Sequence, residues 1–188
     1  MKKSMIVVIL WSSILCKAMA GSSPLENPKA VEKWVETLIK SNKQEKLSKL
    51  HFYFHRLGGG ASSPSAVVVA KANATMPNSF GLTVIRDDPL TVGPEMSSAH
   101  IGYAQGMSAT VSLEEVVLVD YFTLSFGDGS SLAVVGSNAI FHEYRELPIV
   151  GGTGAFRLAR GVVTFQTYFF NATTRDASIQ ADAVVFHY

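Results

Sequence analysis

Cysteine is almost absent from this chain, and its single copy, Cys16, stands within the first 20 residues. Those residues have the three parts of a secretory signal peptide: an N-terminal pair of lysines, an apolar run from Met5 to Leu15, and small residues up to Ala20. We expect residues 1–20 to be removed and the mature chain to be secreted. A secreted chain without cysteine has no disulfide, so its fold must be stabilised by its core alone.

An excess of one charge is also lacking. Residues 1–20 hold three of the 16 basic side chains and no acidic one, which leaves 13 basic against 15 acidic residues and a net charge of −2. No basic tract remains that would bind nucleic acid or an anionic membrane. The run from Met5 to Leu15 is too short to span a bilayer, and no later run is long enough. We expect a soluble protein with neither kind of partner.

Several catalytic patterns are missing as well. The five histidines show no paired spacing with a carboxylate of a known metal type, and no Gly-x-Ser-x-Gly elbow of a serine hydrolase occurs. The segment from Val150 to Gly161 resembles a phosphate loop, but the residues that follow are β-branched and aromatic, which is typical of a strand and not of the helix such a loop requires. These glycines therefore indicate a turn before a long strand. We expect neither a metal nor a nucleotide cofactor.

One segment has helical periodicity. Within residues 27–50, Asn27 and Pro28 form a helix start, and apolar residues recur on one face. That face consists of Val31, Trp34, Val35, Leu38 and Ile39. We expect a surface helix packed on the main domain or on a partner subunit; a membrane-surface anchor is the weaker alternative, because the polar face mixes both charge signs. The expected organisation is a signal peptide over 1–20, a helix and linker over 21–48, and one domain over 49–188.

The remainder of the chain reads as strands. Hydrophobic residues make up 47% of the sequence, enough for a sizeable core. Short β-rich runs separated by glycine, proline and asparagine turns predict strands at 49–57, 65–72, 80–87, 99–112, 115–127, 131–139, 144–150, 155–170 and 177–188. This pattern indicates an all-β antiparallel sandwich or barrel. We favour a closed barrel, because closure removes exposed edges.

Alternation along the expected strands assigns their faces. Phe54 and Arg56 share one face with Phe52, and Phe165 and Thr167 share one face with Val163 and Phe169. The face of small residues consists of Gly102, Ala104, Gly106, Ser108 and Thr110. Small side chains on one wall leave space for a ligand, and aromatic faces with single polar groups suit a flat phenolic molecule. Ordinary core packing explains the same pattern equally well.

Three polar positions and two sequons are candidate functional features. Arg145, in a strand-like context, needs a partner or a ligand if it is buried, or else pairs with Glu143 or Glu146 on the surface. Asn138 ends an apolar strand. Asp88, in the stretch Asp87-Asp88-Pro89, is most simply a turn residue. Asn73-Ala-Thr75 and Asn171-Ala-Thr173 are glycosylation sequons at turn-like places.

A set of motifs spread over residues 48–188 resembles those of plant dirigent proteins. The motifs are Leu50-His-Phe-Tyr-Phe-His55, Asp87-Asp-Pro-Leu-Thr91, Gly102-Tyr-Ala-Gln-Gly106, Gly136-Ser-Asn138, Arg145, Val150-Gly-Gly-Thr-Gly-Ala-Phe156 and Ala159-Arg-Gly161. The resemblance implies an eight-stranded antiparallel barrel, a homotrimer, secretion to the plant apoplast, and a pocket at the barrel mouth that orients phenolic quinone methides or phenoxy radicals.

The departures from that family direct the functional prediction. Lignan-forming dirigents carry aspartates at the positions of Arg56 and Asn138 and a tyrosine at that of Ser108, whereas Arg145 and Thr167 are retained here. The start at Lys49 and the ending at Tyr188 look like the legume pterocarpan synthases. The resemblance thereby implies an isoflavan-4-ol dehydratase that closes the pterocarpan ring through a quinone methide. A non-catalytic dirigent that orients radicals made by an oxidase, and a phenolic- or glycan-binding module without turnover, remain alternatives.

On the dehydratase hypothesis, each candidate residue has an expected role. Arg145 stabilises a phenolate-like oxygen, Asn138 and Thr167 supply hydrogen bonds, and Asp88 is the best candidate for the general acid, with Tyr103 behind it. The residues expected to contact substrate are Phe54, Arg56, Tyr103, Ser108 and Phe165.

Overall fold

The structure, a computed structural model, describes residues 28–41, 44–58, 64–72 and 74–188. The expected signal peptide and the sequon at Asn73 lie outside these residues. The described strands are β1 (Lys46–Arg56), β2 (Ala66–Ala70), β3 (Thr83–Thr91), β4 (His100–Thr110), β5 (Val117–Phe126), β6 (Ser131–Ala139), β7 (Arg145–Thr153), β8 (Arg160–Phe170) and β9 (Ala177–His187). The helices are α1 (Pro28–Ser41) and the short 3₁₀ helices η1 (Pro77–Ser79) and η2 (Gly154–Phe156).

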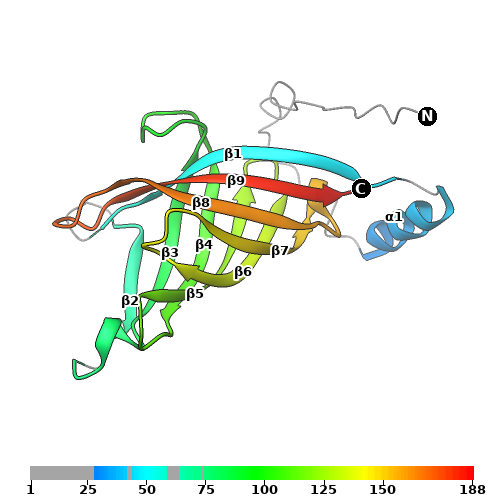
Figure 1. Ribbon diagram of the computed structural model, residues 1–188. Coiled ribbons are helices and arrows are strands. Elements are labelled where there is room, and N and C mark those ends of the chain that lie inside the picture. The colour runs from blue at the N-terminus through cyan, green and yellow to red at the C-terminus, as the bar shows by residue number, and fades with distance from the viewer. Residues whose placement is uncertain (1–27, 42–43, 59–63, 73) are drawn as a thin grey trace, which may run out of the picture.

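The strands form one antiparallel sheet that closes on itself. Their order is β1-β9-β8-β7-β6-β5-β4-β3-β2, and β1 also pairs with β3 through Tyr53 with Thr91 and Phe54 with Leu90. This pairing closes eight strands into a barrel, while β2 extends the sheet beyond β3 (Figure 1). The predicted eight-stranded barrel is confirmed.

Alternation places the apolar residues inside, as expected. Phe52 and Phe54 of β1 are buried, and the ring of Phe54 packs 5.7 Å from that of Phe122 and 5.2 Å from that of Phe165. The most buried aliphatic members of the core are Leu90, Leu124, Leu132, Val134, Leu147, Val163 and Val185. These side chains fill part of the barrel and leave the rest to a cavity.

The small-residue face of β4 points inward. Ala104, Ser108 and Thr110 are all buried. Gly106 permits a close strand approach, because a Cβ there would stand 2.1 Å from the carbonyl oxygen of Tyr121. Its cross-strand partner on β3 is Arg86. No side chain of β4 therefore lies directly across from the Arg86 side chain.

Two strand boundaries differ from the prediction in ways that matter for function. Strand β3 continues through Asp87-Asp88-Pro89 to Thr91, so these residues are not a turn. The continuous pairing with β4, which includes Asp88 with Ala104 and Pro89 with Tyr103, holds them in the sheet. As a result, Asp88 follows the alternation of β3 and points into the barrel.

The glycine segment also differs. Strand β7 runs through Gly151 and Gly152 to Thr153, and η2 then makes the connection, so β8 begins at Arg160 and not at residue 155. Gly154 and Leu158 adopt positive φ angles of 62° and 59°, which end the extended conformation. The turn is therefore longer than the sequence indicated.

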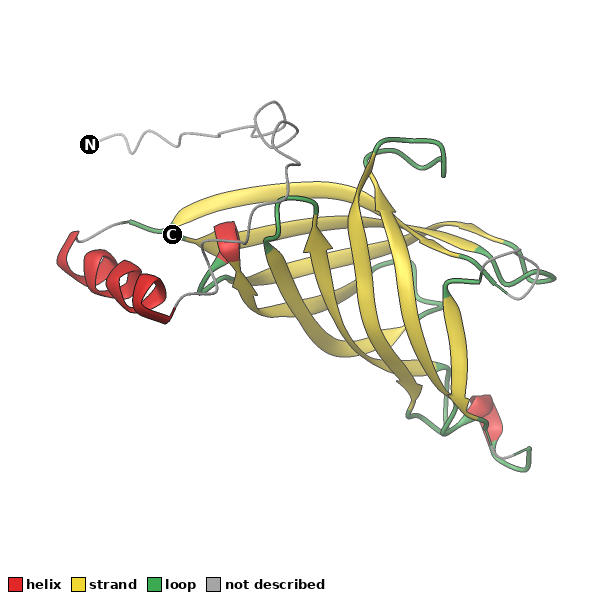
Figure 2. Ribbon diagram, turned by 180° about the vertical axis from the view of Figure 1, so that it is seen from behind, coloured by secondary structure: helices red, strands yellow, loops and turns green. Residues whose placement is uncertain are grey.

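Helix α1 lies beside one end of the barrel (Figures 1 and 2). No helix residue is buried, and the guanidinium of Arg157, just after η2, lies 4.7 Å from the centre of the Trp34 ring. Val31, Val35 and Leu38 of the apolar stripe are half-buried, and Ile39 is 76% exposed. Among the described residues, no helix has the length and apolarity to cross a membrane.

Candidate functional site

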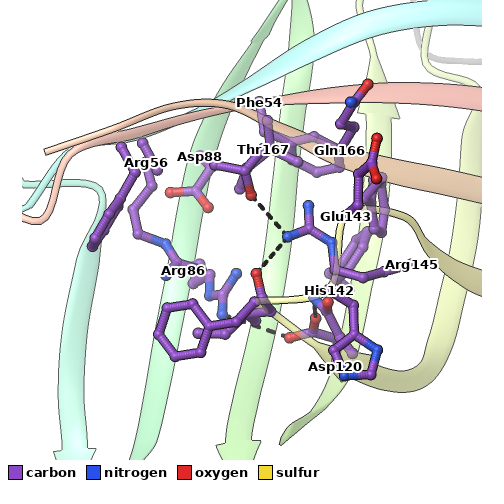
Figure 3. Close-up of a pocket in the computed structure, with 18 residues that line it drawn as sticks. Phe54, Arg56, Arg86, Asp88, Asp120, His142, Glu143, Arg145, Gln166 and Thr167 are labelled. Carbon is purple, nitrogen blue, oxygen red and sulfur yellow. Dashed lines mark hydrogen bonds and ion pairs between the residues drawn. The ribbon is translucent and has the colours of Figure 1, made fainter. Parts of the chain in front are cut away.

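A cavity of about 320 Å³ opens within the barrel, and among the described residues every strand of the barrel except β4 contributes to its lining (Figure 3). Its apolar walls include Phe54, Phe122, Ile140, Phe165, Phe170 and Ile179. Its polar groups include Arg56, Arg86, Asp88, Asp120, Asn138, Arg145 and Thr167. A mostly apolar cavity with several phenylalanine rings and converging charged groups suits a flat, amphipathic ligand.

Arg145 and Thr167 meet in this cavity. Arg145 is 6% exposed at the start of β7, and its Nη1 donates to Thr167 Oγ1 and to the carbonyl oxygen of Ile140, both at 2.8 Å. Burial lowers the pKa of Arg145, and nearby Asp120 opposes that shift. No ion pair joins Arg145 to Glu143 or Glu146 in the part of the chain that the structure describes. The predicted juxtaposition of Arg145 with Thr167 is therefore present.

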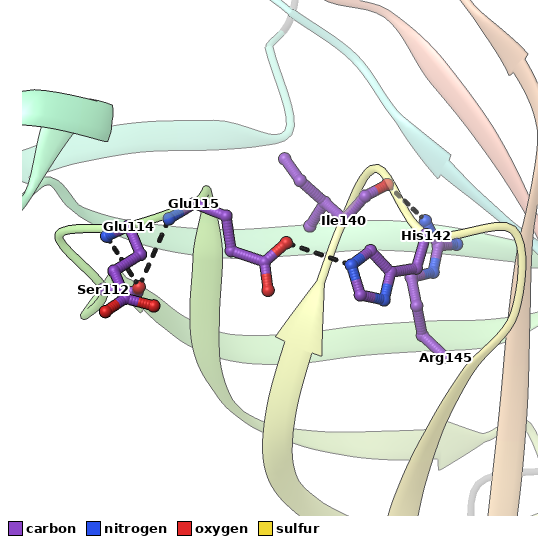
Figure 4. Close-up of polar contacts among 6 residues, drawn as sticks. All are labelled: Ser112, Glu114, Glu115, Ile140, His142 and Arg145. Atoms are coloured by element: carbon purple, nitrogen blue, oxygen red, sulfur yellow. Dashed lines mark hydrogen bonds and ion pairs between the residues drawn. The ribbon is translucent and has the colours of Figure 1, made fainter.

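The hydrogen bond to Ile140 also fixes the loop between β6 and β7. On the far side of this loop, His142 Nε2 lies 3.0 Å from Glu115 Oε2 of the β4–β5 connection (Figure 4). The backbone amides of Glu114 and Glu115 in turn donate to Ser112 Oγ. The Arg145 guanidinium thus connects Thr167 in the cavity with the β6–β7 loop at the rim.

Asp88 is a buried carboxyl group, only 2% exposed. The hydroxyl of Ser65 donates a hydrogen bond to its Oδ1. Burial raises the pKa of Asp88, although the Ser65 hydrogen bond and the charges of Arg56 and Arg86 act in the opposite direction. A carboxyl group with a raised pKa retains its proton to higher pH, which suits it to donate that proton to a leaving group.

Asp120 is a second inward carboxylate, which sequence reasoning missed. It is 1% exposed, accepts hydrogen bonds from the hydroxyl of Ser108 and from Asn138 Nδ2, the latter at 2.6 Å, and lies 3.6 Å from Arg86 Nη2. The alternation of β5 could have revealed it, because Asp120 lies on the same strand face as Leu118, Phe122 and Leu124, which all point inward. A charged residue on an otherwise apolar face is a candidate functional group.

Three guanidinium groups line the same cavity. Burial, together with the charge of neighbouring Arg86, lowers the pKa of Arg56 to about 10, so Arg56 still carries its charge at neutral pH. Arg86 was not predicted to be part of the site. With Arg145, these side chains place three guanidinium groups in a cavity that also holds the carboxyl groups of Asp88, Asp120 and Glu143. Guanidinium donors suit ligands that bear phenolate-like oxygens.

A family model for dirigent-like proteins matches residues 47–186. The chain belongs to the dirigent-like family. It is 46% identical to pterocarpan synthase 1 of Glycyrrhiza echinata over 152 residues, which cover 77% of this chain and 80% of that protein. It is 38% identical to dirigent protein 1 of Arabidopsis thaliana over 192 residues, 99% of each chain. A solved pterocarpan synthase dirigent protein aligns with a TM-score of 0.72 and 43% identity, covering 78% of this chain and 87% of that one.

The remaining candidates of this dirigent-like barrel take different places. Phe54, Arg56, Phe165 and Asn138 line the cavity. Ser108 is 2% exposed and lies behind Asp120, to which it donates, so it supports the wall instead of forming it.

The expected position of Tyr103 is wrong. Tyr103 follows the outward alternation of β4, is 43% exposed, and packs its ring 4.6 Å from that of His100 on the outside of the dirigent-like barrel. Because β3 continues as a strand, the neighbour of Asp88 across the sheet is Ala104, and the Tyr103 side chain points the other way.

A bulge in β8 changes another expected face. The pairing with β9 shifts between Thr167 and Phe169, so Phe170 lines the cavity, whereas Phe169 does not. The sequon residue Asn171 follows in the next turn, where its Oδ1 accepts hydrogen bonds from the amides of Thr173 and Thr174. Among the described residues of this dirigent-like chain, no group of three His, Cys, Asp or Glu side chains is placed to hold a metal ion.

Proposed function

We propose that the protein is an isoflavan-4-ol dehydratase that closes the pterocarpan ring stereoselectively through a quinone methide. The observation that carries the proposal is the pairing, within one aromatic cavity, of a carboxyl group of raised pKa, Asp88, with buried guanidinium groups. Two proteins named pterocarpan synthase 1, at 46% and 42% identity, support the same substrate class.

In the first step, the C4–O bond of the substrate breaks. The proton of Asp88 passes to the departing hydroxyl group, which leaves as water, while the 7-hydroxyl loses its proton to solvent and its oxygen becomes the carbonyl of the quinone methide. Arg145, held by Thr167 and Ile140, stabilises the negative charge that builds on that oxygen.

In the second step, the 2′-hydroxyl oxygen adds to C4 and forms the new ring. Its proton passes to the Asp88 carboxylate, which regains its initial state, and the 7-oxygen recovers a proton from solvent. Phe54 and Phe165, whose rings pack 5.2 Å apart, form a wall that restricts which face of C4 is open to attack.

The test is incubation of the purified protein with a panel of isoflavan-4-ol stereoisomers without any oxidase, followed by chiral analysis of the products. We expect a pterocarpan of one handedness. Arg145→Met should lower kcat by about 100-fold or more, because it removes a preorganised charge next to the developing phenolate. Arg160→Met is the matched control, since Arg160 lies on the same strand pair but pairs outside with Glu45. Equal rates in both variants would reject the role of Arg145.

The second candidate function is a non-catalytic dirigent that orients phenoxy radicals produced by a separate oxidase. The observation in its favour is the match to dirigent protein 1, which extends over 99% of both chains. Product from an isoflavan-4-ol alone supports the dehydratase. Product that forms only when a laccase and a phenol are both added supports the radical-orienting role.

Secretion and a homotrimer belong to the same proposal. The features of residues 1–20 support entry into the secretory route, and the apoplast is the expected destination. The outer face supports assembly, because the cross-strand partners Val67, Ile85, Met107 and Tyr121 form an apolar row in which every member is at least 40% exposed. Glycosylation at Asn73 and Asn171 would be visible as a loss of mass on glycosidase treatment.

A further inference from the structure

The dehydration steps above leave Asp120 without a role. Both of its oxygens are already engaged: Oδ1 by the hydroxyl of Ser108 and by Arg86 at 3.6 Å, and Oδ2 by Asn138 Nδ2 at 2.6 Å. Every one of these partners donates, so the Asp120 oxygens act only as acceptors. Asp120 therefore serves to hold its neighbours, in contrast to Asp88, to which the described residues donate through the Ser65 hydroxyl alone.

The neighbour that Asp120 controls most directly is Asn138. The two ends of an amide side chain differ, because the nitrogen donates and the oxygen accepts. Since the carboxylate can only accept, it requires Nδ2 to face it, and Oδ1 is then turned away from Asp120. Asn138 is 9% exposed and lines the cavity, and its Oδ1 is buried with no hydrogen-bond partner in the described part of the chain. A buried unpaired acceptor is costly until a ligand donor reaches it.

Donors surround the same part of the cavity. Arg56 Nε and Arg86 Nε are also buried and have no hydrogen-bond partner among the described residues. Arg86 and Asn138 are both anchored on the Asp120 carboxylate, so they lie within reach of one ligand oxygen. The wall thus offers one acceptor and at least two cationic donors. A free phenolic hydroxyl satisfies both kinds of group at once, whereas a methyl ether can only accept.

We propose that Asp120, Asn138, Arg86 and Arg56 form a subsite that binds a free ring hydroxyl of the phenolic substrate, with Asp120 as the residue that positions Asn138. This subsite sets the specificity of the pocket for a hydroxyl over a methyl ether. The inference rests on the proposed function for the substrate class only. It assigns roles to Asp120 and Arg86 that are separate from acid catalysis by Asp88.

The experiment measures binding without turnover. The probe is an isoflavan with free 7- and 2′-hydroxyl groups, which lacks the 4-hydroxyl and cannot dehydrate, together with its two mono-O-methyl ethers. Dissociation constants are obtained by titration calorimetry. We expect the wild-type protein to bind the diol about tenfold more tightly than one of the ethers, since the ether leaves Asn138 Oδ1 unpaired. The position that is methylated in the weaker-binding ether is the hydroxyl that occupies the subsite.

The variants separate positioning from general damage. Asn138→Leu should bring the diol-to-ether ratio of affinities close to one. Asp120→Asn, which keeps the shape but no longer dictates which end of Asn138 faces it, should lower the ratio several-fold. Ser108→Ala should have a smaller effect in the same direction, and it keeps the test usable if a stronger variant folds poorly. Asp182→Asn is the matched control, because Asp182 bonds to His51 on the exposed face of the sheet. A purely structural role would not change a ratio measured on one folded variant.

Three outcomes overturn the inference: no binding of the diol, equal binding of diol and ethers to the wild type, or an unchanged ratio in both Asn138→Leu and Asp120→Asn. Turnover of an isoflavan-4-ol is measured separately. Turnover without hydroxyl selectivity rejects the subsite and leaves the dehydratase in place. Selective binding without turnover rejects the dehydratase and leaves the subsite as a phenol-binding site.

Discussion

At the scale of single residues, two buried carboxyl groups in one cavity have different surroundings and therefore different chemistry. Asp88 is desolvated and receives one hydroxyl donor, which leaves it free to hold a proton. Asp120 is surrounded by donors and acts as an acceptor. Pairs of titratable groups whose environments differ in this way are a common basis for dividing roles in an active site.

Replacing Asp88 tests its role as the proton donor. Asp88→Asn keeps the acceptor for the Ser65 hydroxyl but has no proton to give, so we expect kcat to fall by about 100-fold. The acid must be protonated to act. Because burial raises the pKa of Asp88, the wild-type kcat/KM should fall as pH rises through that raised value, and this limb of the profile should be absent in the variant.

Asp87→Asn is the control for this experiment, because Asp87 is the next residue on β3 and is exposed on the outer face. It should leave the maximal rate unchanged and move the pH limb only slightly to lower pH, because the charge of Asp87 is the smallest of the influences that act on the pKa of Asp88. If Asp88→Asn retains the wild-type rate, or shows the same pH limb as the wild type, the proton comes from another group.

The residue scale is also where sequence reasoning was least complete. Arg145, Thr167, Phe54 and Phe165 were found because alternation or family motifs marked them. Asp120 and Arg86 were missed because the alternation of their strands was not used to test charged residues. The prediction for Tyr103 is wrong because it conflicts with the alternation of β4, which places Tyr103 on the face opposite to Gly102 and Ala104.

At the scale of elements, the glycine segment of β7 has a structural function. A Cβ at Gly152 would stand 2.4 Å from the carbonyl oxygen of Phe156 and 2.7 Å from that of Ser131, whereas a Cβ at Gly151 would meet nothing within 4 Å. Gly152 therefore permits η2 to fold back against the end of the sheet. The two glycines are adjacent and yet differ fully in the space around them.

We expect Gly152→Ala to lower the free energy of unfolding by about 2 kcal/mol, because backbone atoms must move to accommodate the methyl group. Gly151→Ala should change it by less than about 1 kcal/mol, since the site is open. Chemical denaturation followed by circular dichroism measures both. Similar losses in the two variants would mean that strand propensity, and not the close approach of η2, requires glycine here.

The bulge in β8 gives a second prediction at this scale. Because the register shifts between Thr167 and Phe169, the aromatic ring at the cavity is that of Phe170. Phe170→Ala should raise KM for the isoflavan-4-ol by about tenfold, through loss of one aromatic contact with the ligand rings. Phe169→Ala, on a side chain equally exposed but outside the cavity, is the control. The opposite order of effects, measured by steady-state kinetics, would place the bulge elsewhere.

At the scale of the whole molecule, the sequence predicted the closed barrel, the N-terminal helix and the approximate position of every strand, because alternation and turn residues are local signals. It did not predict that β2 lies outside the closed barrel or that β1 meets β3 over only two residue pairs. Both depend on the twist and register of all the strands together, and no local pattern records them.

The outer face of the barrel leads to the last prediction. The row formed by Val67, Ile85, Met107 and Tyr121 crosses four strands and exposes large apolar side chains side by side. A homotrimer that buries this row would contain three copies of any substitution made in it. Met107→Glu should therefore dissociate the trimer, because a carboxylate without a partner is costly to bury.

Sedimentation velocity on the purified protein decides this. We expect the wild type at three times the mass of the chain, Met107→Glu at the mass of one chain with the circular dichroism of an intact sheet, and the control Lys49→Glu unchanged. Lys49 is exposed on β1, where it pairs with Val184 of β9, away from Tyr53 and Phe54 through which β1 meets β3. A wild-type monomer, or a Met107→Glu protein that remains trimeric, would mean that the apolar row is not the surface through which this barrel assembles.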